Sequence, residues 1–64
     1  MEPRALEIGK TYIFKERNIL ENVVYKGTEK YTMAGAEGVN YLFAAAEKTY
    51  QLCYREVCRF IQPL

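Results

Sequence analysis

The sequence predicts one small domain built mainly of β-strands. Four short runs are rich in aromatic and β-branched residues, the residue types that favour strands. Glycines or an Arg-Asn pair stand between these runs, where turns are expected. A chain of 64 residues, half of them hydrophobic, holds one domain with enough apolar material for a core. Residues 1–5 lie outside this pattern, and we expect them to be disordered.

The predicted strands follow one another closely along the chain. Alternate residues of a strand point to the same face, which places Tyr41 with Phe43, for example. Glu21 breaks this pattern, because it falls on the apolar face of its strand beside Val23. The predicted strands are Lys10–Lys15, Ile19–Lys26, Tyr31–Ala34 and Val39–Ala45, joined by turns at Arg17–Asn18, Gly27–Glu29 and Gly35–Gly38.

The C-terminal part of the chain fits either a strand or a helix. A strand over Thr49–Tyr54 places Leu52 on an apolar face with two tyrosines. A helix gives an apolar stripe that ends at Ile61, with Leu52 on its polar side. This helix would run over about residues 44–61 and make an α+β fold, with a three- or four-stranded antiparallel sheet. The apolar periodicity alone leaves both structures open.

Three segments of the chain together resemble a known group of small barrels. The segments are Glu7–Lys15 (EIGKTYIFK), Val23–Gly27 (VVYKG) and Tyr54–Leu64 (YREVCRFIQPL). They are similar to Src-homology-3-like barrel proteins of bacteria and phages, in which a helical turn of the type E-V-x-x-x-I precedes the last strand. Glu56, Val57 and Ile61 match that turn here. The resemblance implies an all-β, five-stranded barrel with Thr49–Tyr54 as a strand, one helical turn near Arg55–Cys58 and a final strand around Phe60–Ile61.

The barrel implied by this resemblance has a definite core. A closed sheet has almost no unpaired edge, which suits a chain with little volume to bury. The apolar residues expected to fill the core are Ile8, Tyr12, Phe14, Val23, Tyr25, Met33, Tyr41, Phe43, Leu52, Val57 and Ile61.

The residue types that most enzymes use are missing from this chain. It has no His, Ser, Asp or Trp, so it cannot form a Ser-His-Asp triad, and a cysteine nucleophile would have no imidazole base. Cys53 and Cys58 are five positions apart, which fits neither a CxxC redox motif nor a zinc site. We therefore expect no enzymatic activity, no metal, no cofactor and two free thiols.

The sequence indicates a cytoplasmic protein that does not enter a membrane. The segment after Met1 has no apolar stretch of the kind found in secretion signals. The longest apolar run, Tyr41–Ala46, is far shorter than the ~20 residues that a membrane-spanning helix needs. Lysine and arginine nearly balance glutamate, and the formal net charge of +1 gives no strong basic excess.

A small domain without catalytic groups is expected to present a binding surface. Its six tyrosines favour a protein–protein interaction module, since tyrosine offers an apolar ring and a polar tip to a partner. Within this hypothesis we expect a phage or prophage factor that acts on a host protein, whereas the resemblance itself implies a fold and no particular activity. Nucleic-acid binding is the alternative, because cations stand beside aromatic rings in the first strands, and a homodimer is a further option. The candidate partner-binding residues are Tyr12, Lys15, Arg17, Tyr25, Lys26, Lys30 and Tyr31.

Overall fold

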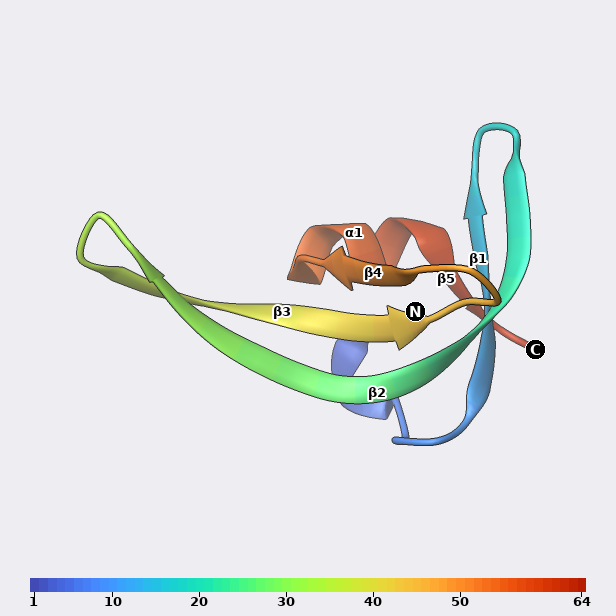
Figure 1. Cartoon of the computed structure of the whole chain (residues 1–64), viewed down its shortest axis with the longest axis horizontal. Helices are drawn as coiled ribbons and strands as arrows, with labels where there is room; N and C mark the ends of the chain where they lie inside the picture. Colours follow the sequence, from blue (N-terminus) through green and yellow to red (C-terminus); the bar gives the residue numbers. More distant parts are fainter.

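Five antiparallel strands and one short α-helix form the fold (Figure 1). This computed structural model describes residues 1–64. The strands pair in the order β4-β3-β2-β1-β5, and the prediction of five strands with a short helix near the C-terminus is confirmed. The elements are η1 (Pro3–Ala5), a 3-10 helix, β1 (Thr11–Glu16), β2 (Ile19–Met33), β3 (Ala36–Ala44), β4 (Thr49–Leu52), α1 (Tyr54–Phe60) and β5 (Ile61–Pro63).

β2 is the longest strand, and it belongs to two parts of the sheet. Its first part pairs with β1 and its later part with β3. The register shifts between Tyr25 and Gly27, so that one extra residue forms a β-bulge. Gly27 has a φ of +112°, a conformation that glycine adopts without strain. Because the bulge bends β2 without ending it, the predicted connection at Gly27–Glu29 between two separate strands is wrong.

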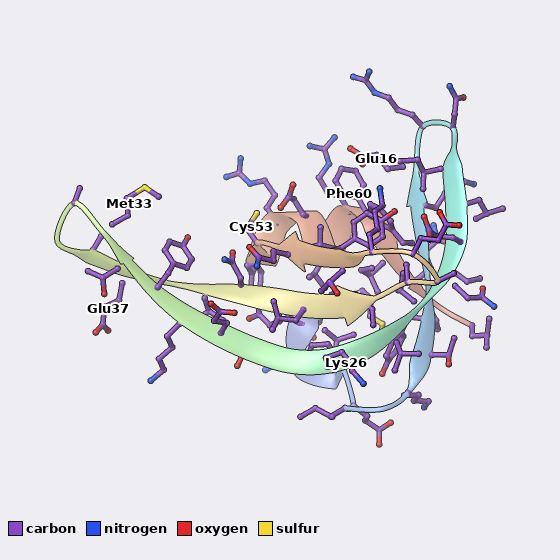
Figure 2. The ribbon with its side chains drawn as sticks, viewed as in Figure 1. Glu16, Lys26, Met33, Glu37, Cys53 and Phe60 are labelled. Atoms are coloured by element: carbon purple, nitrogen blue, oxygen red, sulfur yellow. The ribbon has the colours of Figure 1, made fainter.

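Beyond the bulge, β2 and β3 run on as a two-stranded arm that projects from the rest of the sheet (Figure 2). The tip of the arm is a turn at Ala34 and Gly35, both with positive φ, which matches the right-handed twist of a hairpin. Tyr31 lies opposite Gly38, and its ring covers the space where a Cβ would stand. Met33 is 69% exposed because it lies near the tip of the arm, so its predicted place in the core is wrong.

The sheet curls but does not close, so the predicted closed barrel is wrong. The two edge strands, β4 and β5, do not pair with each other, and α1 joins them and packs against both. Both edge strands are short, and Pro63 in β5 has no backbone N–H to donate to a further strand. The helix therefore covers the gap between β4 and β5, which would pair with each other in a closed barrel. Its Val57 side chain points into the core and is completely buried.

The core consists of eight buried side chains, all of which the sequence predicts. Every strand and α1 contribute at least one of them. Phe14 meets the rings of Tyr50 and Phe60 edge-on, with centroids 4.4 and 5.9 Å away. Tyr41 is only partly buried, and Ile8 is 74% exposed in the turn before β1, so the predicted place of Ile8 in the core is wrong. The eight residues are Tyr12, Phe14, Val23, Tyr25, Phe43, Leu52, Val57 and Ile61.

Leu52 decides between the two structures for the C-terminal part of the chain. It lies in β4, which pairs with β3, and it is only 6% exposed. The alternative α+β fold with a helix over residues 44–61 is therefore wrong. The backbone N–H of Cys53 donates to Oε1 of Glu56, 2.9 Å away, and α1 begins at the next residue. The helix ends at Phe60, so it is longer than the single predicted turn, and β5 follows directly.

The N-terminal segment is packed against the rest of the chain, which differs from the disorder expected for residues 1–5. Pro3–Ala5 form η1, and Pro3 is buried. Proline suits the start of a helix because its φ is already fixed near the helical value. The amino group of Met1 donates to the carbonyl oxygen of Cys58, 3.1 Å away. This bond connects the N-terminal segment to α1.

Replacing Leu52 with alanine should destabilise the protein by about 2–5 kcal/mol, because the change empties part of a close-packed core. A fold of this size has only about 5 kcal/mol of stability, so the variant should be largely unfolded under mild conditions. Urea unfolding followed by circular dichroism measures the change. Met33→Ala is the control, and it should shift the stability by no more than about 0.5 kcal/mol. A wild-type midpoint for Leu52→Ala would contradict the buried strand.

Candidate functional site

A groove opens at one end of the curled sheet, between η1, the start of α1, and strands β2 and β3. Its volume is ≈ 570 Å³. Three tyrosines from three different elements line it, together with residues of the N-terminal segment. We call it the tyrosine groove, and its lining residues are Glu2, Pro3, Arg4, Leu6, Tyr25, Tyr41 and Tyr54.

The three tyrosines differ in how far they are buried. Tyr25 lies in β2 at the bulge, and its ring packs on that of Phe43 with the centroids 5.2 Å apart. Tyr41 precedes Phe43 by two residues in β3, so both side chains are on the same face of the strand. Tyr54 is the first residue of α1 and is 58% exposed. The groove therefore has a fixed, buried floor and an exposed aromatic rim.

The N-terminal segment forms the other wall of the groove. Pro3 is buried, and Leu6 packs against the core from outside. Nε of Arg4 lies 3.2 Å from Oε2 of Glu2, and both side chains are well exposed. An exposed ion pair of this kind adds little to stability. Both charges can therefore turn toward a ligand at small cost.

The groove offers neutral rings and hydroxyls for binding. Burial raises the pKa of Tyr25 above its ordinary value of 10.0, with smaller contributions from Tyr41 and Tyr12. Its hydroxyl is therefore protonated and uncharged at neutral pH. No group of three or more His, Cys, Asp or Glu side chains in the structure is placed to hold a metal ion. The groove can bind a ligand through apolar contact and hydrogen bonds.

The structure does not bring the seven predicted partner-binding residues to one surface. Tyr12 and Tyr25 are core residues, 2% and 6% exposed, and only Tyr25 also lines the tyrosine groove. The Tyr12 hydroxyl is already used, since it accepts a hydrogen bond from the backbone N–H of Glu7, 2.9 Å away. The other five lie near the end of β1 (Lys15), in the β1–β2 turn (Arg17), at the bulge (Lys26) and on the arm (Lys30 and Tyr31).

Tyr41 and Tyr54 are candidate site residues that the sequence did not single out. The strand alternation places Tyr41 beside Phe43, which is why it was expected in the core. Tyr54 follows β4 by two residues, at the point where the chain turns into α1. The one feature of the sequence that pointed to a tyrosine-lined site was the presence of six tyrosines. The convergence of three of them depends on the pairing of β2 with β3 and on the packing of α1 against the sheet, and no local pattern predicts these contacts.

A further tyrosine contact explains why Glu21 lies on an apolar strand face. The hydroxyl of Tyr50 donates to Oε2 of Glu21, 2.6 Å away, so the carboxylate has a partner in its half-buried position. The amino group of Lys48 lies 4.6 Å from the centre of the Tyr50 ring. The hydrogen bond to Glu21 raises the pKa of Tyr50 above its ordinary value. This bond joins β2 to the edge strand β4 across the curl of the sheet.

No helix in the structure is both long and apolar enough to cross a membrane. Comparisons with models of protein families, with curated proteins and with solved structures give no match to this chain.

Replacing Tyr50 with phenylalanine should destabilise the protein by about 1–2 kcal/mol, because the Glu21 carboxylate loses its donor. The wild-type bond also predicts a pH dependence. The pKa of Tyr50 is higher in the folded state, so the bond contributes fully below about pH 10 and is lost as the pH rises through the folded pKa. Urea unfolding of both proteins between about pH 8 and pH 11 measures this. The difference between them should shrink at the alkaline end, and a constant difference would contradict the bond.

Proposed function

We propose that this chain is a non-catalytic module that binds an extended segment of another protein in the tyrosine groove. The observation that carries the proposal is the convergence of three tyrosine rings, from β2, β3 and α1, on one groove of ≈ 570 Å³. A tyrosine ring gives a large apolar contact, and its hydroxyl can pair with a peptide backbone. Tyrosine is also enriched among the residues that carry most of the binding energy at protein interfaces.

The three tyrosines of the groove belong to regular secondary structure, which favours binding. Tyr25 and Tyr41 belong to paired strands, and Tyr54 belongs to a helix that packs against the sheet. Because these backbones are already ordered, little conformational entropy is lost when a ligand binds. Arg4 and Glu2 at the edge of the groove offer one charge of each sign to the flanks of a bound segment.

We also propose that the chain is related to Src-homology-3-like proteins. Tyr12 and Phe14 of the segment Glu7–Lys15 (EIGKTYIFK) lie in β1, and Glu56 and Val57 lie in the helix before the last strand. These positions agree with the pattern that carries the resemblance, while the sheet itself stays open. We also propose that the chain is a phage or prophage factor that acts in the cytoplasm on a host protein, since the proteins it resembles come from bacteria and phages.

Replacing Tyr54 with alanine tests the groove, because this exposed tyrosine adds little to the stability of the fold. Binders to the wild-type protein are selected from a library of random peptides displayed on phage. Their affinities for both proteins are then measured by isothermal titration calorimetry. The variant should bind about 30-fold more weakly, which corresponds to the roughly 2 kcal/mol lost with a central interface tyrosine.

Tyr31→Ala is the matched control for this experiment. It removes the same side chain from the arm, outside the groove, and should change the affinity by no more than about twofold. Selected peptides that bind Tyr54→Ala as tightly as the wild type would contradict the proposal. A library that yields no binder to the wild type would contradict it as well.

A further inference from the structure

A second hollow, with a volume of ≈ 550 Å³, lies at the other end of α1. It is bounded by the turn that joins β1 to β2 and by the last residues of the helix. Figure 2 shows Glu16 and Phe60, which belong to its two sides, on the same side of the molecule as α1. We call it the basic hollow, and its lining residues are Lys15, Glu16, Arg17, Arg59, Phe60 and Gln62.

The cations of the basic hollow have no carboxylate within ion-pair distance. Both ion pairs of the chain lie within residues 2–10. Glu21 accepts the Tyr50 hydroxyl, and Glu56 accepts a backbone N–H at the start of α1. Glu16 is the one carboxylate in the hollow, so three cations and one anion give a local charge of +2, in a chain whose net charge is +1. An anionic ligand complements this concentration of positive charge.

Arg17 lies in the β1–β2 turn with a backbone conformation that arginine rarely adopts. Its φ is +49°, in the left-handed region that disfavours residues other than glycine. Glycine would fit the turn better, so the turn itself does not require the cationic side chain.

Phe60 gives the basic hollow an aromatic surface. Its ring is edge-on to that of Phe14, with centroids 5.9 Å apart, and this contact fixes its position. The guanidinium carbon of Arg59 lies 5.8 Å from the centre of the Phe60 ring. A nucleotide can bind to both the ring and the cations, because its base stacks on an aromatic side chain while its phosphate pairs with a cation. The carboxylates of an acidic peptide would use the cations alone.

We propose that the basic hollow binds single-stranded nucleic acid, with Lys15, Arg17 and Arg59 on the phosphates and a base against Phe60. The hollow shares no residue with the tyrosine groove, and the two lie at opposite ends of α1. It also differs from the nucleic-acid surface expected from the sequence. That surface relied on tyrosines of the first strands, and two of these, in β1 and β2, are buried and cannot stack with bases.

Fluorescence anisotropy with a labelled oligothymidylate of about 15 nucleotides tests the site at low salt. We expect a dissociation constant in the range of about 1–100 μM, which is typical of binding through a few phosphate contacts. The logarithm of the affinity should fall with the logarithm of the salt concentration with a slope of about −2. This slope follows from three contacts, since each phosphate contact on a single strand contributes about −0.7.

Arg17→Gly is the decisive variant, because glycine suits the positive φ and the variant should be at least as stable as the wild type. It should bind about tenfold more weakly near 20 mM salt, and its slope should be less steep by about 0.7. Lys30→Ala is the matched control, since it removes one positive charge from the arm and should change the affinity by no more than about twofold. Tyr54→Ala should bind the oligonucleotide like the wild type, which separates this site from the proposed peptide groove.

Three results would overturn the proposal. The first is the absence of binding at about 100 μM protein and low salt. The second is equal weakening by Arg17→Gly and Lys30→Ala, which would show that only the net charge of the protein matters. The third is competition by oligoglutamate of equal charge that is as strong as competition by unlabelled oligothymidylate. This last result would assign the basic hollow to acidic protein segments, because no base would then be recognised.

Discussion

The bend in β2 gives the sheet its curl and so encloses the core. An antiparallel sheet needs cover for its apolar face, and a chain of 64 residues has little material for a second layer. The bulge at Tyr25 and Gly27 lets one strand pair with β1 before the bend and with β3 after it. The sheet thereby folds over its own apolar face, and the eight buried side chains meet inside the curl. Glycine at position 27 permits this because the backbone there has a positive φ.

The short helix completes the fold because the sheet stays open. α1 joins the two edge strands and packs against both, and Val57 fills the space beneath it. The two ends of the helix consequently lie beside different parts of the sheet. Tyr54 at its start borders the tyrosine groove, and Phe60 at its end borders the basic hollow. Both candidate surfaces thus follow from the place that the helix takes between β4 and β5.

The tyrosine groove is nearly neutral and the basic hollow is positively charged. The net charge of the whole chain does not show this difference. Neutral rings and hydroxyls dominate the tyrosine groove, where Arg4 is paired with Glu2. In the basic hollow the cations have no carboxylate within ion-pair distance, since both ion pairs of the chain lie within residues 2–10. A charge of +1 for the whole chain therefore coexists with a local excess of positive charge at one end of α1. Electrostatic binding depends on this local field more than on the total charge.

The residue pattern alone was enough to predict a mainly β fold and the buried side chains, because the alternation of apolar residues reports which side chains share a face. All eight buried residues follow from that alternation and from the resemblance at the C-terminal end. The place of Gly27 in a bulge could not be predicted, since glycine fits a turn equally well, and neither could the exposure of Ile8 and Met33. The tertiary structure also buries Tyr12 and Tyr25, which were first assigned to binding. It brings Tyr41 and Tyr54 close to the N-terminal segment. These outcomes depend on contacts between distant parts of the chain, and a local pattern cannot show which face of a strand the curl will enclose.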